Sequence, residues 1–294
     1  MAGVNDPVFR SISKRMGAAL TYTEMISAKG LEYKNQKTRT MLFMLDEEKP
    51  AAVQLFGKDP YALAEQARGL EEDYRNDIAL IDINMGCPSR KIAGKGEGAA
   101  LMKDFALAEK ILCSVVAAVK LPVSVKFRKG YELDEDIAVE FARMAASCGV
   151  AQIAVHGRTA RQLYGGRSDR ELIGRVKGAV SIPVIASGDV FGAEDIESYF
   201  TEYGADGVMV ARGAQGNPWI FAAHTPSLKE RIEVAREHTQ RLARFLPHRL
   251  SSMRRHVSWY FRGTAQASRI RRTVHECATL GDYEALFEQI MTWQ

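Results

Sequence analysis

The sequence predicts an α/β fold, a (β/α)8 TIM barrel followed by a small C-terminal helical domain. Two observations predict this class. Short apolar runs rich in β-branched residues alternate with helical patterns up to about residue 224, at the spacing of βαβ units in a parallel sheet. After about Thr225 the strand pattern stops and only helical patterns follow. We therefore expect a barrel domain over residues 1–224 and a helical domain over residues 225–294.

The elements follow in order after an N-terminal loop that enters a helix at Pro7. Seven runs are predicted as strands because each is nearly uniformly hydrophobic in its first half, as a sheet covered on both faces requires. They are Ala19–Met25, Ala51–Phe56, Leu80–Gly86, Pro122–Arg128, Ala151–Gly157, Pro183–Asp189 and Gly207–Gly213. Helices are predicted at Pro60–Tyr74, Phe105–Val119, Asp134–Cys148 and Ala193–Tyr203, and then at Leu228–Leu246, Leu250–Arg262, Ile270–Cys277 and Tyr283–Met291.

Composition excludes several classes of protein. The 294 residues are 46% hydrophobic and 26% charged, as in globular proteins. No run of about 18 apolar residues predicts a membrane span, and no secretory signal opens the chain. The four cysteines form no CxxC pair, which argues against a zinc or disulfide framework and fits a cytoplasmic location. No HExxH or other dense cluster of metal ligands is visible, so we expect no metal site.

Positive charge is concentrated near the C-terminus. The window from His238 to His275 contains no acidic residue and no lysine, yet it holds nine arginines. Charge of one sign suggests contact with a polyanion, and a guanidinium suits phosphate because it donates two hydrogen bonds at once. The nine are Arg241, Arg244, Arg249, Arg254, Arg255, Arg262, Arg269, Arg271 and Arg272.

The C-terminal ends of the predicted strands carry most of the polar residues, and an α/β barrel keeps its active site at these ends. Cys87 follows one strand, between Gly86 and Pro88 and before a glycine-rich loop. Free cysteines are often simply buried, but a tight bend beside a flexible loop presents this thiol to a pocket. No base lies nearby in the sequence to activate a nucleophile. A thiol with a pKa of about 8.5 is mostly protonated at neutral pH, so we expect Cys87 to be a general acid.

Other strand ends suggest a phosphate-bearing cofactor. Lys126 ends a strand, where a fixed cation in a barrel mouth can stabilise a developing anion, and the amide of Gln54 must be hydrogen-bonded there. The last two βα-loops of such barrels often bind phosphate. In this chain they contain Ser187-Gly188-Asp189 and Ala211-Arg212-Gly213. The glycine-rich loop 94–98 lacks a nucleotide fingerprint, so we interpret it as a flexible loop.

Together these pieces resemble the tRNA-dihydrouridine synthase family over nearly the whole chain, and among its branches the bacterial B-type most. The most specific match is Asp82-Ile83-Asn84-Met85-Gly86-Cys87-Pro88, which holds the family's catalytic cysteine. The other matches are Met1-Ala2-Gly3-Val4 with Asp6, Tyr22-Thr23-Glu24-Met25, Val125-Lys126 with Arg128, His156-Gly157-Arg158-Thr159, Ala214-Gln215-Gly216-Asn217-Pro218-Trp219, and Met253-Arg254-Arg255-His256 with Trp259-Tyr260.

The resemblance implies an FMN-bound enzyme that reduces the C5=C6 bond of uridines in tRNA, with NADPH as the reductant. A hydride would pass from reduced FMN to C6, and Cys87 would give its proton to C5. The family's cofactor-binding positions correspond to Met1, Ala2, Gln54, Lys126, His156, Ser187, Gly188, Asp189, Ala211 and Arg212. Its substrate-binding positions correspond to Asn84, Arg128, Arg158, Gln162, Arg254, Arg255 and Arg271, the last three being part of the arginine window that would grip tRNA phosphates.

The chain departs from the family pattern in three places. Ser187 stands where the family usually has Asn, and Ala211 stands where it usually has Gly, but backbone contacts could survive both changes. In relatives the first barrel strand precedes the Met-Ala-Gly motif, and this sequence begins at that motif. We therefore expect the true start to lie upstream. Because a missing strand leaves bare sheet edges, a protein made from Met1 is expected to be poorly soluble or to hold FMN weakly.

Two alternative functions stay open at this point. An FMN barrel acting on a free pyrimidine, of the dihydroorotate dehydrogenase type, would leave the basic helices without a function. A non-catalytic RNA-binding barrel would be colourless and indifferent to Cys87→Ala. The sequence carries no signal for the tRNA position that is modified, for NADPH over NADH, or for the oligomeric state.

Overall fold

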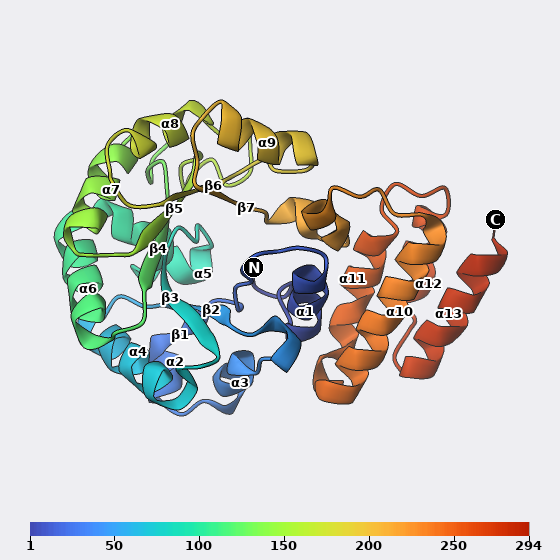
Figure 1. Ribbon diagram of the computed structural model, residues 1–294. Helices are drawn as coiled ribbons and strands as arrows, with labels where there is room; N and C mark the ends of the chain where they lie inside the picture. The colour runs from blue at the N-terminus through green and yellow to red at the C-terminus, as the bar shows by residue number, and fades with distance from the viewer. Residues whose placement is uncertain (294) are drawn as a thin grey trace.

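A parallel sheet surrounded by helices and a separate bundle of helices form the two lobes of the molecule (Figure 1). The computed structural model describes residues 1–293. Seven parallel strands pair in chain order, which confirms the predicted barrel-type α/β fold with a C-terminal helical region. The strands are β1 (Ile26–Ser27), β2 (Ala51–Phe56), β3 (Ile78–Met85), β4 (Val123–Arg128), β5 (Gln152–His156), β6 (Val184–Ser187) and β7 (Gly207–Met209).

The barrel is open between its first and last strands. Within residues 1–293, β1 and β7 each pair with one neighbour only. Helix α1 (Pro7–Arg15) begins at the predicted proline and contacts the short helix η5 (Pro218–Ala222), which follows β7. Asp6 caps α1, because its Oδ1 accepts hydrogen bonds from the N–H groups of Val8 and Phe9 at 3.1 and 3.0 Å.

The first predicted strand, Ala19–Met25, was wrong in its position, since β1 covers only Ile26–Ser27 and the predicted segment holds a single isolated bridge, from Tyr22 to Ala52. The earlier segment does run beside β2, where the N–H of Thr23 donates to the carbonyl of Ala52 at 2.9 Å. The N–H of Gln54, however, donates to the Thr23 hydroxyl at 3.1 Å and not to a backbone carbonyl. A side chain therefore interrupts the backbone ladder before β1 begins.

The outer helices agree closely with the prediction. Helix α4 (Pro60–Tyr74) has the predicted bounds, and the side chain of Asp59 caps it. Helices α6 (Phe105–Ala118), α7 (Ala138–Ser147) and α9 (Ala193–Thr201) lie within the predicted segments. Helix α8 (Glu171–Lys177) was not predicted, because seven residues give too short a periodic pattern. The remaining short helices are α2 (Ala28–Glu32), α3 (Gln36–Arg39), α5 (Arg90–Ala93), η1 (Thr40–Leu42), η2 (Asp46–Glu48), η3 (Gly98–Lys103) and η4 (Arg212–Ala214).

The helical lobe has its own hydrophobic core. It consists of α10 (Leu228–Phe245), η6 (Pro247–Ser252), α11 (Met253–Tyr260), α12 (Ala267–Val274) and α13 (Leu280–Thr292). Val8 and Ile12 of α1 and Trp219 of η5 also belong to this core, so α1 joins the two lobes. The domain boundary at residue 224 stays a prediction. None of the helices within residues 1–293 combines the length and apolar character that crossing a membrane requires.

Candidate active site

Polar side chains of β2, β3 and β4 form a hydrogen-bonded chain inside the barrel. Asp82 is fully buried, and its oxygens accept from the Ser124 hydroxyl at 2.5 Å and from Gln54 Nε2 at 2.6 Å. Gln54 Oε1 in turn accepts from Asn84 Nδ2 at 2.9 Å. Strand register explains the grouping, because Asp82 pairs with both Gln54 and Ser124 on neighbouring strands. Burial raises the pKa of Asp82 above its ordinary value.

Cys87 lies directly after β3 and is held through its backbone. Its N–H donates to Asn84 Oδ1 at 2.9 Å, and its carbonyl accepts from the N–H of Ala99 at 3.0 Å. The following loop packs closely: a Cβ on Gly98, where φ is +61°, would lie 2.8 Å from the Cys87 carbonyl oxygen. The cysteine is partly exposed and belongs to neither hydrophobic core. Its side chain is therefore not part of the packed interior, and its role at the barrel mouth stays a prediction.

Lys126 of β4 faces the same mouth. Burial, and then the charge of Arg128, lowers the pKa of Lys126 to about 8, while the charges of Asp82 and of a Cys87 thiolate act in the opposite direction. Lys126 pairs with Asn84 in the register of β3 and β4, which places it beside the strand end that Cys87 follows. Burial, followed by the charge of Lys126, also lowers the pKa of His156 at the end of β5. His156 is therefore neutral at pH 7, and Lys126 is still mainly cationic.

The loops after β6 and β7 meet at a second group of charges. Asp189 accepts two hydrogen bonds from Arg158, at 2.8 and 2.7 Å, and one from Arg212 at 2.9 Å. It also accepts from the N–H of Ser168 at 2.8 Å. Burial raises the pKa of Asp189, but the bonds from Arg158 and Ser168 outweigh burial and hold that pKa below its ordinary value. Because two guanidinium groups share one carboxylate, this end of the mouth carries net positive charge.

Three of the predicted substrate residues are engaged within the protein. Arg128 is 3% exposed and donates from Nε to the carbonyl of Gly86 at 2.8 Å and from Nη1 to the carbonyl of Thr159 at 3.0 Å. Arg158 is 2% exposed, and besides Asp189 it donates to the carbonyls of Gly165 and Gly166 at 3.0 and 2.7 Å. Gln162 Oε1 accepts from the N–H of Thr159 at 2.8 Å. These side chains shape the mouth, and their direct contact with substrate stays a prediction.

Comparison with known proteins decides the family. The family model described as "Dihydrouridine synthase (Dus)" matches residues 1–292. The tRNA-dihydrouridine synthase B of Pseudomonas aeruginosa is 36% identical over 307 residues, which cover 97% of this chain and 91% of that protein. This chain belongs to the dihydrouridine synthase family. A probable tRNA-dihydrouridine synthase of Rickettsia conorii is 37% identical and covers 94% of this chain and 86% of that protein.

The dihydrouridine synthase assignment confirms the resemblance inferred from the motifs and makes the chain a flavin-dependent oxidoreductase. Among solved structures, histamine dehydrogenase from Rhizobium sp. 4-9 aligns with a TM-score of 0.54 at 13% identity. The alignment covers 79% of this chain and 43% of that one. At this identity the likeness shows a shared barrel fold alone.

The residues after β5 and β6 fit the phosphate group of a flavin nucleotide. Ser168 Oγ is buried and makes no hydrogen bond to any atom of residues 1–293. It lies against Gly188, where φ is +119° and a Cβ would clash with that hydroxyl and lie 2.7 Å from His156 Cδ2. A buried hydroxyl in need of a partner, a glycine cradle and the net positive charge around Asp189 together suit an anionic group.

The N-terminal motif of the dihydrouridine synthase family brings the two lobes together. In the turn Met1–Gly3, the N–H of Gly3 donates to the side chain of Glu24. Glu24 Oε2 also lies 2.7 Å from Arg249 Nη2 of the helical lobe. A Cβ on Gly3, where φ is +69°, would lie 2.8 Å from Arg255 Nη2. Arg255 of the basic window therefore lies against this turn, and Arg249 is linked to it through Glu24. The predicted flavin contacts of its first two residues stay a prediction.

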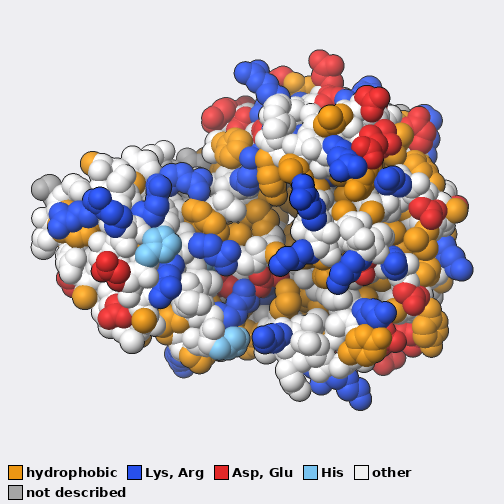
Figure 2. Space-filling model, turned by 180° about the vertical axis from the view of Figure 1, so that it is seen from behind, with side chains coloured by type: hydrophobic (Ala, Val, Ile, Leu, Met, Phe, Trp, Pro, Cys, Tyr) orange, Lys and Arg blue, Asp and Glu red, His pale blue; other side chains and the backbone are white. Residues whose placement is uncertain are grey.

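Lys and Arg side chains spread over the helical lobe and around the hollow between the lobes (Figure 2). Within the arginine window, Arg241 and Arg249 pair with acidic residues, whereas the other seven make no ion pair with any of residues 1–293. Arg255 and Arg271 are exposed, and Arg254 is half-buried, with its Nε donating to a backbone carbonyl at 2.9 Å. Cations without acidic partners on one lobe attract a polyanion.

The sequence analysis missed one buried cluster, which joins the lobes. His238 Nε2 lies 3.2 Å from both oxygens of Asp6, and its Nδ1 lies 3.0 Å from the Tyr260 hydroxyl. His256 Nε2 lies 3.3 Å from Asp6 Oδ2 but is not aligned for a hydrogen bond. Nitrogen and carboxylate oxygen atoms of this kind can bind a metal ion. Asp6 lies more than 200 residues before the two histidines, so a motif search by residue spacing does not find the cluster. The expected absence of a metal site stays a prediction.

Proposed function

We propose that this protein reduces the C5=C6 bond of specific uridines in tRNA to 5,6-dihydrouridine, with FMN as its flavin and NADPH as its reductant. FMN, when bound, supplies the hydride that C6 of the uracil accepts, and NADPH renews that supply. Family membership supports the reaction class. The observation that carries the proposal is the partly exposed Cys87, which lies three residues after Asn84, the partner of Lys126 in the strand register.

Cys87 is proposed to deliver the proton to C5. Its backbone is fixed by Asn84 on one side and by Ala99 on the other, which keeps the sulfur in a defined position. As the C–H bond forms at C5, the S–H bond breaks and a thiolate remains. Lys126 stabilises that negative charge, and solvent then returns a proton to the sulfur. Asn84 Oδ1 accepts from the N–H of Cys87, and its Nδ2 donates to Gln54. We therefore assign Asn84 the positioning of Cys87, in addition to the orientation of the base that the family resemblance implies.

Lys126 and Gln54 are proposed to hold the flavin ring, and the ammonium of Lys126 would stabilise negative charge that develops on the ring. Asp82 decides how the Gln54 amide points, because it takes the Nε2 donor and leaves the oxygen side to Asn84. The phosphate-bearing tail is assigned to His156, Ser187-Gly188-Asp189 and Ala211-Arg212, beside the unbonded hydroxyl of Ser168.

The substrate is proposed to be a whole tRNA and not a free base. The seven arginines of the window without acidic partners offer contacts to a phosphate backbone that a free pyrimidine does not have. The target uridine must leave its stack to reach the barrel mouth, at a cost of a few kcal/mol. Phosphate contacts with the helical lobe offset that cost, and they should weaken steeply as salt is added.

Cys87→Ala tests the proton transfer. We expect the variant to keep its flavin absorbance and its affinity for tRNA and to lose turnover by a factor of about 100 or more, as expected for removal of a general acid. Dihydrouridine formed in tRNA is the readout. Cys113→Ala is the matched control, because Cys113 is the exposed cysteine of α6 and lies outside the mouth. Full activity of Cys87→Ala would remove the proton-donor role.

Substrate size separates the proposal from its alternatives. Reduced enzyme should be reoxidised by tRNA lacking dihydrouridine and only poorly by free uridine or orotate, as followed by flavin absorbance. Rapid reoxidation by orotate would instead favour an enzyme of free pyrimidines. A preparation that binds tRNA but takes up no flavin would favour a non-catalytic RNA-binding protein.

A further inference from the structure

Two exposed aromatic rings lie beside an arginine at the edge of the barrel mouth. The guanidinium carbon of Arg212 lies 4.6 Å from the ring centre of Tyr164 and 5.3 Å from that of Phe191. Tyr164 is 55% exposed and Phe191 is 53% exposed, and neither belongs to a hydrophobic core. Exposed rings that contribute nothing to a core are typical of a binding surface. We call these three residues the aromatic platform.

Buried arginines hold the platform in place. Arg128 Nη1 donates to the carbonyl of Leu163 at 3.2 Å, directly before Tyr164. Arg158 donates to the carbonyls of the next two residues, Gly165 and Gly166, at 3.0 and 2.7 Å. The backbone of Tyr164 is thus fixed on both sides. A ring that is rigid before its ligand arrives loses little conformational entropy on binding.

The platform is close to the reactive cysteine. The guanidinium group of Arg128 that binds the carbonyl next to Tyr164 also binds the carbonyl of Gly86, directly before Cys87. The guanidinium of Arg128 therefore links the backbone next to Cys87 with the backbone next to Tyr164. An RNA chain that places one base at Cys87 can therefore reach the platform with the base of an adjacent nucleotide.

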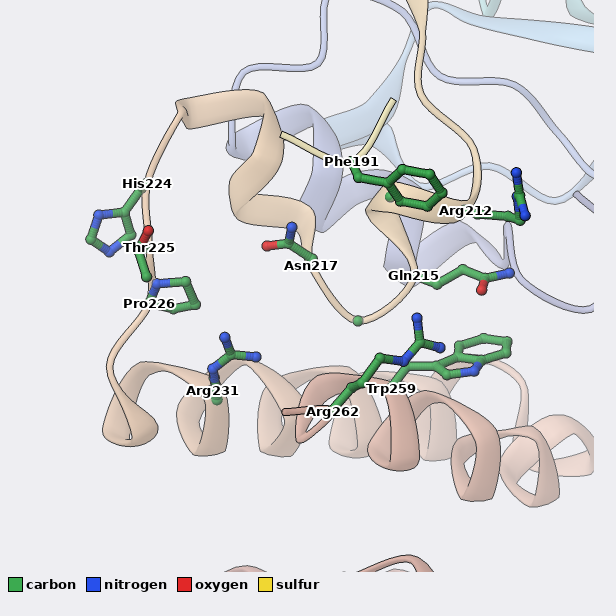
Figure 3. A pocket seen from close by; sticks show the side chains of 12 residues that line it. Phe191, Arg212, Gln215, Asn217, His224, Thr225, Pro226, Arg231, Trp259 and Arg262 are labelled. Atoms are coloured by element: carbon green, nitrogen blue, oxygen red, sulfur yellow. The ribbon is translucent and has the colours of Figure 1, made fainter. Parts of the chain in front are cut away.

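A cleft of about 300 Å³ continues from the platform into the junction of the lobes (Figure 3). Phe191 and Arg212 face it from the barrel, while Arg231, Arg262 and Trp259 face it from the helical lobe. None of the described residues that line it is acidic, and its size is at the lower end of the range for small-ligand sites. Arginines and aromatic rings on both walls suit a ligand that combines an anion with a flat ring.

We propose that the aromatic platform and this cleft bind the nucleotide next to the target uridine, with its base stacked on Tyr164 or Phe191 and its phosphate near Arg262 on the opposite wall. The inference rests on the proposed function, since it concerns the same tRNA. A uridine that leaves its stack also takes a stacking partner away from its neighbour. Aromatic side chains replace that partner in RNA-binding proteins without selecting a particular base.

Binding and turnover of the double variant Tyr164→Ala/Phe191→Ala test this proposal. We expect the Kd for tRNA to rise about tenfold and kcat at saturating tRNA to change little. The single variant Tyr164→Phe, with Phe191 unchanged, should keep the affinity for tRNA, because it retains the aromatic ring. Tyr61→Ala is the matched control, since Tyr61 on α4 is 73% exposed and lies on the outer surface of the barrel. An unchanged Kd for the double variant would overturn the proposal.

Synthetic tRNAs with an abasic ribose on either side of the target nucleotide identify the partner of the rings. When the missing base is the one that stacks on the rings, wild-type protein should bind this tRNA about tenfold more weakly than intact tRNA. The double variant should bind the two tRNAs equally. If the missing base weakens binding of the double variant by the same factor as binding of wild type, on both sides of the target, the proposal is overturned. Binding is measured separately from dihydrouridine formation. Failure of the proposed function would appear as an inactive wild-type protein, whereas failure of this inference would appear as an active wild type with unaffected variants.

Discussion

Asp189→Asn removes the charge shared by Arg158 and Arg212 while keeping the shape of the side chain. Arg158 is 2% exposed, so the variant leaves a buried guanidinium without a counter-charge. Breaking a buried ion pair in this way costs about 3–5 kcal/mol. The Asp189 side chain is 20% exposed and Asn still accepts one hydrogen bond, so we expect the lower end, about 3 kcal/mol. With an m-value of about 3 kcal/mol per M, the urea midpoint should fall by about 1 M.

Urea unfolding followed by far-UV circular dichroism measures this shift, and Asp206→Asn is its matched control. Asp206 also accepts from a backbone N–H, that of Val184 at 2.8 Å, and pairs with Lys177 at 2.7 Å. The Lys177 side chain, however, is 33% exposed, so the loss of that pair should cost less than about 1 kcal/mol. Equal midpoints for the two variants would refute the argument that the burial of Arg158 sets the cost.

Three further outcomes are expected. Arg271→Ala should reduce the slope of log affinity for tRNA against log salt by about 1, as titrations at several salt concentrations would show. The rate of flavin reduction, followed by stopped-flow absorbance, should fall as the pH rises through the pKa of Lys126 at about 8, where the cation is lost. Lys126→Arg should remove that dependence. Gly98→Ala should cost about 1–3 kcal/mol in urea unfolding and slow turnover, because its φ of +61° and the nearby Cys87 carbonyl exclude a side chain. Gly69→Ala, with open space around it in α4, should not destabilise.

The sequence predicted the fold and the chemistry of the strand ends because both follow from local patterns. Alternating strands and helices dictate a parallel sheet, and a parallel sheet brings the ends of all its strands to one face. Gln54, Asn84 and Lys126 were therefore expected at the mouth before their neighbours were known. Asp82 has the same signal: it precedes Asn84 by two residues, so the pleat points both side chains to the same face. It was missed because it lies inside the strand and not at its end.

Contacts between distant segments had no such signal. The family resemblance implies that Arg128 touches the substrate, yet its guanidinium is engaged by carbonyls of the chain after β3 and after β5. Asp189 was predicted to hold the cofactor, and its oxygens are engaged by two arginines and a backbone N–H. In both cases the residue type correctly predicted a charged side chain. Which partner that side chain binds depends on how the loops fold, and the sequence pattern does not show this.

The junction between the lobes is also built from contacts between distant segments. His238 of α10 and His256 of α11 reach the carboxylate of Asp6, which also caps α1 and follows the turn Met1–Gly3. Arg255 of the helical lobe lies against the same turn. A displacement of the helical lobe must therefore move the edge of the barrel mouth with it. On the proposed function, this buried junction fixes the distance from the tRNA-binding arginines to the thiol. If the proposed function holds, that distance, which no motif encodes, decides which uridine reaches the mouth.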